Sequence, residues 1–153
     1  METCLIEVNA MKLTNYTDYS LRVLIFLATR NSNKLVNIKD IADTYSISKN
    51  HLMKVIYDLG KLGYVETIRG RNGGIRLGKA PEQINIGEVI RKTEDDFNLV
   101  ECFDKETNNC ILSPNCGLKH VLNKALSAYL AVLDQYTLQD VIFNQDNIRK
   151  LLS

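Results

Sequence analysis

Apolar side chains recur every three or four residues in three stretches of the first half of the chain, a spacing that places them on one face of a helix. The first predicted helix begins at a cap, Thr17. The second covers 38–45 after the cap Asn37, and the third covers 49–63 after the cap Ser48. The side chains expected to face inward are Leu21, Leu24, Ile25, Leu27 and Ala28 in the first helix, Ile38, Ile41 and Ala42 in the second, and Leu52, Val55, Ile56, Leu59 and Leu62 in the third.

The pattern changes to the alternation of strands after Gly63. Residues 64–69 and 74–79 flank the glycine-containing sequence 70–73, which predicts a β-hairpin with a narrow tip. Two short helices joined by the polar turn 46–48 and followed by a hairpin have the order of a winged helix-turn-helix.

Two helices separated by a loop are predicted next. Asn85 and Glu88 have the spacing of a capping box that opens a helix over 86–93. Residues 94–116 are polar and aperiodic, which is typical of a loop. Residues 117–135 form the longest helical run. Its broad apolar face is expected to carry Leu118, Val121, Leu122, Ala125, Leu126, Tyr129, Leu130 and Leu133.

A last short helix is predicted after the cap Thr137. The patterns together predict a mainly α-helical fold, with a winged helix-turn-helix that carries a small β-hairpin wing, and one long helix. We divide the chain into an extension over 1–10, disordered or not native, a winged helix-turn-helix DNA-binding domain over 11–80, and a region of cysteine loop and dimerisation helices over 81–153.

The distribution of charge separates the two halves of the chain. The 153 residues are 45% hydrophobic and 24% charged, as in ordinary globular proteins. No apolar run approaches the roughly 18 residues that span a membrane, so we expect a cytoplasmic protein. Although the net charge is +1, residues 11–79 carry 12 Lys and Arg against five Asp and Glu, and residues 80–153 carry seven against 11. Only the first half is therefore expected to meet a polyanion such as DNA.

The third predicted helix offers polar side chains to a DNA groove, because the N-terminal residues of the second helix of this motif face the base edges. The residues at those positions are Lys49, Asn50, His51 and Lys54. Ser46 and Ser48 stand where hydroxyls and helix-end N–H groups can hold phosphate. Arginine at a hairpin tip suits phosphate contact or insertion into the minor groove. The wing offers Arg69, Arg71, Arg76 and Lys79. A solvated hairpin explains these residues singly, whereas their combination with the two helices favours DNA binding.

Three of the four cysteines lie in the predicted loop. Cys102, Cys110 and Cys116 fall within 15 positions, whereas Cys4 stands apart. In a reducing cytoplasm this grouping favours metal ligands over disulfides. The gaps of seven and five residues are too wide for the Cys-x-x-Cys pairs of zinc fingers and differ from ferredoxin spacings. Three thiolates can hold three corners of an iron–sulfur cluster and leave the fourth iron to a weaker oxygen or nitrogen donor, which suits a sensor.

The identity of the fourth ligand stays open from the residues alone. The candidates are His120, Asp104, Glu101 and Asp18. His120 stands four positions after Cys116 and would also complete a zinc site with three cysteines, although a solvated helix residue is the more ordinary interpretation. Asp18 by itself is a first-turn acid that the helix dipole favours.

The sequence resembles the Rrf2 family of bacterial winged-helix transcriptional regulators from Met11 to the last helix. The segments that carry the resemblance are 11–22, 47–55, 62–78 and 86–94. The cysteine segment, E-C-F-D-(x)5-C-x-L-S-P-x-C-G-L-K-H-V-L, is specific and resembles the nitric-oxide-sensitive branch. The family member that controls cysteine metabolism lacks the three cysteines, and the regulator of cluster assembly has different residues around them.

The resemblance implies a homodimer that represses transcription at double-stranded operator DNA, pairs through the helix over 117–135, and responds to nitric oxide. Each subunit would hold an iron–sulfur cluster, most often described as 4Fe–4S and sometimes as 2Fe–2S. The implied ligands are the thiolates of Cys102, Cys110 and Cys116 and, from the partner subunit, the carboxylate at the position of Asp18, with Arg22 setting that aspartate. Nitrosylation or loss of the cluster would derepress nitrosative-stress genes.

Three other functions remain as alternatives. A regulator that senses iron, cluster supply or oxidants would use the same ligands. A zinc-stabilised structural DNA binder would use His120. A thiol redox enzyme is disfavoured, because the chain has no Cys-x-x-Cys pair and no convincing base beside a cysteine. We therefore expect a regulator and not an enzyme.

Overall fold

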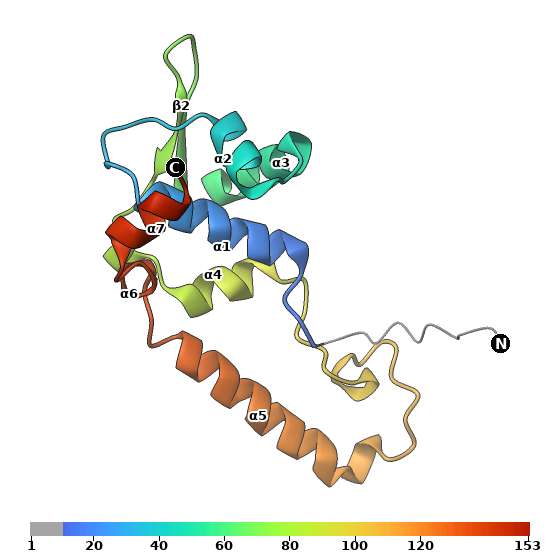
Figure 1. Cartoon of the computed structure of the whole chain (residues 1–153). Coiled ribbons are helices and arrows are strands. Elements are labelled where there is room, and N and C mark those ends of the chain that lie inside the picture. The colour runs from blue at the N-terminus through green and yellow to red at the C-terminus, as the bar shows by residue number, and fades with distance from the viewer. Residues whose placement is uncertain (1–10) are drawn as a thin grey trace, which may run out of the picture.

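A body of short helices carries two projections, a β-hairpin and a long helix (Figure 1). The computed structural model describes residues 11–153, so the predictions for the extension over 1–10 lie outside the described residues. The first half consists of α1 (Asn15–Ala28), α2 (Ile38–Tyr45), α3 (Lys49–Lys61), β1 (Val65–Ile68) and β2 (Gly74–Leu77). The second half adds α4 (Ile86–Thr93), α5 (Gly117–Leu133), α6 (Leu138–Val141) and α7 (Gln145–Leu151), with short 3-10 helices at Pro81–Gln83, Glu101–Phe103 and Ser113–Asn115. The mainly α-helical fold with a hairpin wing is confirmed.

The cap of α1 is Thr14, three residues before the predicted cap Thr17. The Thr14 hydroxyl oxygen accepts a hydrogen bond from the backbone N–H of Thr17 at 3.3 Å, whereas Thr17 itself is fully buried within the helix. The backbone N–H and the hydroxyl of Thr14 both donate to the Glu94 carboxylate, at 2.8 and 3.0 Å. Glu94 directly follows α4, so a contact from a distant part of the sequence selects the first of the two threonines.

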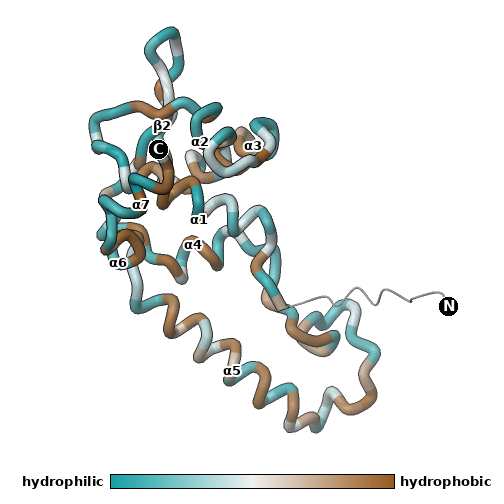
Figure 2. Tube along the Cα trace, in the orientation of Figure 1, coloured by the Kyte–Doolittle hydropathy of each residue, from teal (hydrophilic) through white to brown (hydrophobic). Residues whose placement is uncertain are grey.

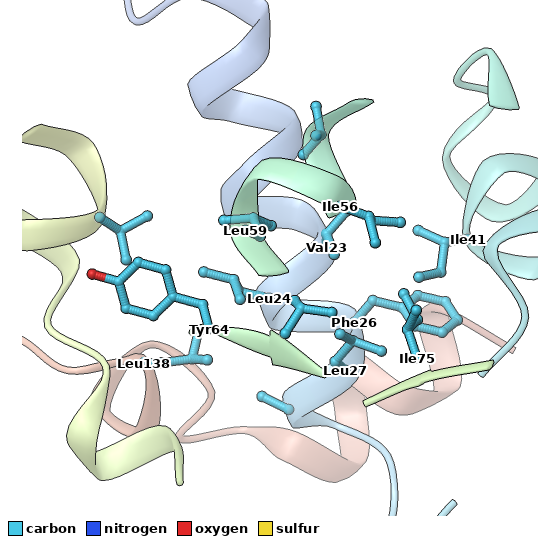
Figure 3. Close-up of a cluster of buried hydrophobic side chains, with 14 of the residues drawn as sticks. Val23, Leu24, Phe26, Leu27, Ile41, Ile56, Leu59, Tyr64, Ile75 and Leu138 are labelled. Carbon is cyan, nitrogen blue, oxygen red and sulfur yellow. The ribbon is translucent and has the colours of Figure 1, made fainter. Parts of the chain in front are cut away.

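More of α1 is buried than a single stripe. Its buried apolar residues are Val23, Leu24, Phe26, Leu27 and Ala28. The predicted inward residues Leu21 and Ile25 are only half-buried. Because α1 packs against α3, α4, α6 and β2, it lies at the centre of the core, which Figure 3 shows in close-up.

The helix-turn-helix corner follows the prediction closely. α2 covers the predicted residues, and the Asn37 side chain caps it by accepting from the N–H of Lys39 at 2.9 Å. Ser46 ends α2 in the left-handed region, with φ of 54°. Ser48 holds the cap position of α3, but its side chain makes no capping hydrogen bond. The prediction for Ser48 is therefore confirmed in position and wrong in the bond it makes.

The wing is a two-stranded antiparallel hairpin in which Val65 lies opposite Leu77 and Ile68 opposite Gly74. Its tip requires glycine at position 73, because a Cβ there would lie 2.1 Å from the carbonyl oxygen of Ile68. The base of the wing is held by Val36, which exchanges two backbone hydrogen bonds of 2.9 Å with Ile75. The predicted hairpin is confirmed.

One hydrophobic core joins residues from both sides of Pro81. The second half contributes Ile84, Ile86, Val89, Ile90, Leu138 and Ile142, which pack with the buried residues of α1, α3 and the wing. The boundary predicted between 80 and 81 does not divide this core.

The capping box predicted at α4 forms only in part. The Asn85 side chain accepts from the N–H of Glu88 at 3.0 Å. The Glu88 carboxylate pairs with Lys92 at 2.5 Å instead of returning to the N–H of Asn85. One half of the reciprocal pair is therefore replaced by an ion pair along the same helix.

The predicted long helix is present as α5, and none of its residues is buried within the described part of the chain. Its exposed large hydrophobic residues are Leu118, Val121, Tyr129 and Val132. Hydrophobic and hydrophilic residues alternate along its whole length (Figure 2). Among residues 11–153, no helix has the length and apolar character to cross a membrane.

The chain does not end with the short helix capped by Thr137. That cap is confirmed, with a complete capping box at the start of α6, but the prediction that α6 is the last element is wrong because α7 follows. α7 closes the C-terminal end of α1: Arg149 Nε donates to the carbonyl oxygen of Thr29 at 2.7 Å, and Arg30 Nη2 donates to that of Leu152 at 2.8 Å. These contacts span about 120 positions, so local sequence patterns do not reveal them.

Candidate nucleic-acid interface and cysteine loop

α3 separates its side chains into a buried face and an exposed one. The buried face carries Leu52, Val55, Ile56 and Leu59, as predicted. The exposed residues include the four predicted DNA contacts Lys49, Asn50, His51 and Lys54. Ser46 and Ser48 are also exposed, at the turn before α3. The packing of one face against α1 and α2 leaves the other available to a ligand.

Three further residues of this exposed face were missed by the sequence prediction. Met53 is 49% exposed and Tyr57 is 63% exposed. Lys61 Nζ lies 4.5 Å from the centroid of the Tyr57 ring, a cation–π distance. These residues continue the row that begins at Lys49 with a spacing of four. That spacing was the available signal, but the prediction considered only polar side chains.

The cations of the wing differ in their surroundings. Arg69 and Arg71 are exposed near the tip. Arg76 instead pairs across the strands with Glu66, with 2.7 Å between Nε and Oε2. Lys79 Nζ lies 5.1 Å from the centroid of the Tyr64 ring, at the base of the wing. Arg69 and Arg71 are therefore better placed for a phosphate than Arg76, whose charge is already matched.

Asp18 and Arg22 form an ion pair on the surface of α1. Arg22 donates from Nε to Asp18 Oδ1 at 3.2 Å, and its Nη2 lies 2.8 Å from Oδ2. The two side chains are 44% and 42% exposed, respectively, so the carboxylate is oriented by Arg22 and remains accessible to another molecule.

Arg22 also contacts the helix-turn-helix corner. Its Cζ lies 5.8 Å from the centroid of the Tyr45 ring, and the Tyr45 hydroxyl donates to the carbonyl oxygen of Arg22 at 3.2 Å. Tyr45 is the last residue of α2, directly before the left-handed Ser46. A continuous set of contacts therefore joins Asp18 to the turn in front of α3.

The three cysteines of the loop lie at the edges of short turns. Cys102 is buried in the 3-10 helix Glu101–Phe103, and Cys110 and Cys116 are half-buried. All three are free thiols. Cys116 is also the N-terminal cap residue of α5, without a side-chain capping bond, so the loop leads directly into the long helix.

The alternative fourth ligands have different surroundings. The Glu101 carboxylate accepts from the N–H of Asn109 at 2.9 Å. The Asp104 carboxylate accepts from the N–H of Glu106 and the hydroxyl of Thr107, at 2.9 and 3.0 Å. These hydrogen bonds, the one from Glu106 first, lower the pKa of Asp104. Both carboxylates thus stabilise the loop, whereas His120 is exposed on α5.

The described chain does not bring the predicted metal ligands together. Within residues 11–153, no three side chains of His, Cys, Asp or Glu are grouped closely enough to hold a metal ion. The donor set still fits an iron–sulfur cluster in its chemistry: three uncrosslinked thiols on one loop, the soft donors that such clusters take.

The chain is similar to known proteins over most of its length. The Rrf2 family, described as iron-dependent transcriptional regulators, matches residues 13–144. The chain belongs to the Rrf2 family. Among Rrf2 relatives, the HTH-type transcriptional regulator NsrR of Bacillus licheniformis is 90% identical over 94% of this chain and 100% of that protein. The HTH-type transcriptional regulator NsrR of Bacillus subtilis is 75% identical over 93% of this chain and 97% of that protein.

Solved structures show the same fold. T. potens IscR has a TM-score of 0.70 at 26% identity and covers 88% of each chain. CymR, the global cysteine regulator of B. subtilis, has a TM-score of 0.65 at 30% identity and covers 86% of this chain and 95% of its own.

The resemblance found in the sequence is thereby confirmed. This Rrf2 protein is a DNA-binding transcriptional regulator of the NsrR type and not an enzyme. Which of its side chains touch DNA or a metal stays a prediction.

Proposed function

We propose that this Rrf2 protein is a cytoplasmic repressor that senses nitric oxide through an iron–sulfur cluster. The observation that carries the proposal is the group of three free thiols on a loop that runs directly into α5. The 90% identity to an NsrR regulator supports the same assignment. With the cluster intact the protein binds its operator, and loss of the cluster releases the DNA.

DNA binding is assigned to α3 and the wing. The exposed polar row at the start of α3 is the part that a helix-turn-helix protein inserts in the major groove. Arg69 and Arg71 at the hairpin tip would contact phosphates or the minor groove beside it. An operator with two half-sites about one helical turn or more apart follows from a two-fold symmetric dimer.

The dimer is assigned to α5, whose apolar residues are exposed along its length. A second copy of the chain would bury them, which is favourable by about 25 cal/mol for each Å² of apolar surface removed from water. In the dimer that the family resemblance implies, each cluster takes its fourth ligand from the other subunit.

Cys102, Cys110 and Cys116 would hold the cluster, of the 4Fe–4S type most often described for the family, and Asp18 of the partner subunit would be the fourth ligand. When bound, the cluster supplies iron that nitric oxide attacks, and the oxygen donor is the weakest of the four. Release of Asp18 would leave its carboxylate paired with Arg22 alone and alter the contacts of Arg22 with Tyr45. The turn before α3 would then change, and the two recognition helices would lose their spacing.

Operator affinity of the loaded, nitrosylated and cluster-free protein tests the proposal. Anaerobically purified protein should be brown and contain iron and sulfide. A coupling of about 3 kcal/mol would weaken operator binding more than 100-fold when the cluster is lost. Mobility shifts with the three forms measure this ratio, and equal affinities would contradict the proposal.

Two pairs of variants separate the ligands from their neighbours. Cys110→Ser should abolish the visible absorbance of the cluster, whereas Cys4→Ser should retain it. Asp18→Asn should speed the loss of this absorbance, whereas Asp40→Asn, which changes the first-turn acid of α2, should not. A colourless protein that contains zinc would favour the structural site with His120. A response to iron chelation or oxygen but not to nitric oxide would favour the other sensors.

A further inference from the structure

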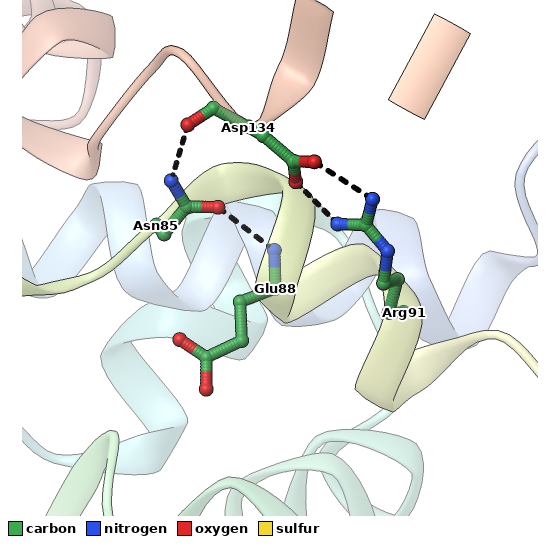
Figure 4. Close-up of polar contacts among 4 residues, drawn as sticks. All are labelled: Asn85, Glu88, Arg91 and Asp134. Carbon is green, nitrogen blue, oxygen red and sulfur yellow. Dashed lines mark hydrogen bonds and ion pairs between the residues drawn. The ribbon is translucent and has the colours of Figure 1, made fainter. Parts of the chain in front are cut away.

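The α4–α5 junction is held by a set of contacts that the sequence analysis did not anticipate (Figure 4). Asp134 is the C-terminal cap residue of α5. Its carboxylate accepts two hydrogen bonds from the Arg91 guanidinium, one of them from Nη2 to Oδ2 at 2.8 Å. Its backbone oxygen accepts from Asn85 Nδ2 at 2.7 Å. The cap residue before α4 and a residue of its last turn therefore both bind the C-terminal end of α5.

Gly87 makes this arrangement possible. A Cβ at Gly87 would lie 2.0 Å from Asp134 Oδ1 and 3.0 Å from Arg91 Nη1. Any other residue at this position would therefore displace the Asp134 carboxylate. Glycine inside a helix is less favourable than alanine, so its place in α4 has a structural reason in this contact.

A small change of angle at the junction produces a large displacement at the far end of α5. α5 has no buried residue in the described chain. The segment after its C-terminal end is attached to the core by two backbone hydrogen bonds: the N–H of Ile86 donates to the carbonyl oxygen of Tyr136, and the N–H of Leu138 donates to that of Ile84. A 17-residue helix is about 25 Å long at about 1.5 Å per residue. A rotation of about 10° at the junction would therefore move Cys116 by about 4 Å.

α4 also connects this junction to the first half of the chain. α4 packs against α1, and Glu94 beyond its end holds the cap Thr14 of α1. The angle between α4 and α5 therefore sets the position of the cysteine loop and the dimer helix relative to α1 and, through the core, to α3.

We propose that Arg91 and Asp134, seated over Gly87, are positioning residues that fix the angle of α5 and thereby couple the state of the cysteine loop to operator affinity. The proposal rests on the proposed function for the cluster. Neither residue lies in the DNA-reading face or among the predicted metal ligands. Removing the contact is expected to leave cluster loading intact and to uncouple it from DNA binding.

Operator affinity is measured for full-length protein in loaded and cluster-free forms, and the ratio of the two is compared among variants. Arg91→Gln and Gly87→Ala should each reduce the wild-type ratio at least about fivefold, the lower end of typical allosteric couplings. Gly87→Ala does so without changing charge. The absorbance of the cluster per subunit should stay at the wild-type value. Asp146→Asn, which removes a loose ion pair of 3.9 Å within α7, is the matched control and should keep the wild-type ratio.

Hydrogen exchange of the cluster-free protein gives a second readout that does not depend on the sensor. The amides of Ile86 and Leu138, which donate across the junction, should exchange faster in Arg91→Gln and in Asp134→Asn than in wild type, because the junction opens more often. Wild-type ratios in Arg91→Gln and Gly87→Ala would overturn the proposal, as would unchanged exchange. If Gly87→Ala does not fold, Asp134→Asn takes its place in the affinity measurement. Equal affinities of the two wild-type forms would instead refute the proposed function, and hydrogen exchange alone would then decide whether the junction is held by this pair.

Discussion

Two tyrosine hydroxyls on either side of the core have opposite surroundings. The Tyr16 hydroxyl donates to Asp58 Oδ2 at 2.7 Å and so connects the start of α1 to α3. Burial, and then the hydrogen bond to Asp58, raise the pKa of Tyr16. Tyr64 is fully buried, and no residue among 11–153 partners its hydroxyl at hydrogen-bonding geometry. The pKa of Tyr64 is also raised, by burial first and then by the nearby Glu88 carboxylate.

Removal of the Tyr16 hydroxyl should destabilise the fold, whereas removal of the Tyr64 hydroxyl should not. Tyr16→Phe loses a hydrogen bond to a charged group and should lower the free energy of unfolding by about 1.5 to 3 kcal/mol. Tyr64→Phe removes a desolvated group without a partner, so stability should stay unchanged or rise by up to about 1 kcal/mol. Urea unfolding followed by circular dichroism measures both values in parallel.

The pH dependence of the Tyr16 effect follows from the direction of its pKa shift. The hydroxyl must keep its proton to donate, and a raised folded pKa favours that form. Its contribution to the free energy of unfolding is therefore complete below pH of about 10, the ordinary tyrosine pKa, and is lost only as the pH rises through the raised value.

A destabilising Tyr64→Phe would show that the Tyr64 hydroxyl has a partner, such as an ordered water, and would contradict its description as an unpaired group.

At the scale of elements, the wing shows how pairing divides residues of one type into different roles. The sequence presents three arginines along one hairpin, and all were predicted to contact DNA. The antiparallel register places Arg76 opposite Glu66, and an ion pair forms between them. Arg69 and Arg71 stand near the tip, beyond the last paired residues, where no such partner lies opposite.

Alanine substitutions in the wing should therefore have unequal effects on DNA binding. Arg71→Ala should weaken operator binding and reduce the slope of log affinity against log salt by about 0.9, the value for one lost phosphate contact on duplex DNA. Arg76→Ala should change the slope much less, because its charge is matched by Glu66. Fluorescence anisotropy at several salt concentrations measures both, and equal slopes for the two variants would refute the distinction.

At the scale of the whole molecule, several of the exposed large apolar residues lie where the chain extends away from its core. The body buries one continuous cluster that draws on both halves of the sequence. α5 buries none of its residues in the described chain, and Ile111 and Leu112 in the cysteine loop are also exposed. An apolar face of this length on a separate helix is typical of an interaction surface.

Charge placed on this face should separate the proposed dimer. Val121→Lys puts an ammonium group where Val121 is 59% exposed and should yield a monomer in sedimentation velocity. Operator affinity should fall by about 100-fold or more, because two linked half-site contacts become one. Asn123→Lys, an exposed polar site on the same helix, is the control and should remain dimeric. A dimeric Val121→Lys protein with unchanged operator affinity would exclude this face as the interface.

The sequence by itself determined the elements whose signals are local. The helices over 38–45 and 86–93, the cap residues Asn37 and Thr137, and the hairpin are each specified within a few positions of their own residues. Helical periodicity and capping bonds act over three or four residues, so a short stretch of sequence is enough to specify each of these elements. For the same reason the exposure of the predicted DNA contacts of α3 could be inferred from the sequence.

Only the tertiary structure decided the features that depend on residues far apart in the chain. Glu94 selects Thr14 as the cap of α1, and the end of α1 holds α7 in place. The Asp134 carboxylate occupies the space that a side chain at position 87 would need, so this position is glycine. The sequence also placed the three cysteines in one loop, but the described chain by itself does not gather them. Each of these outcomes is set by contacts between distant segments, which compete with local preference and have no periodic signature in the sequence.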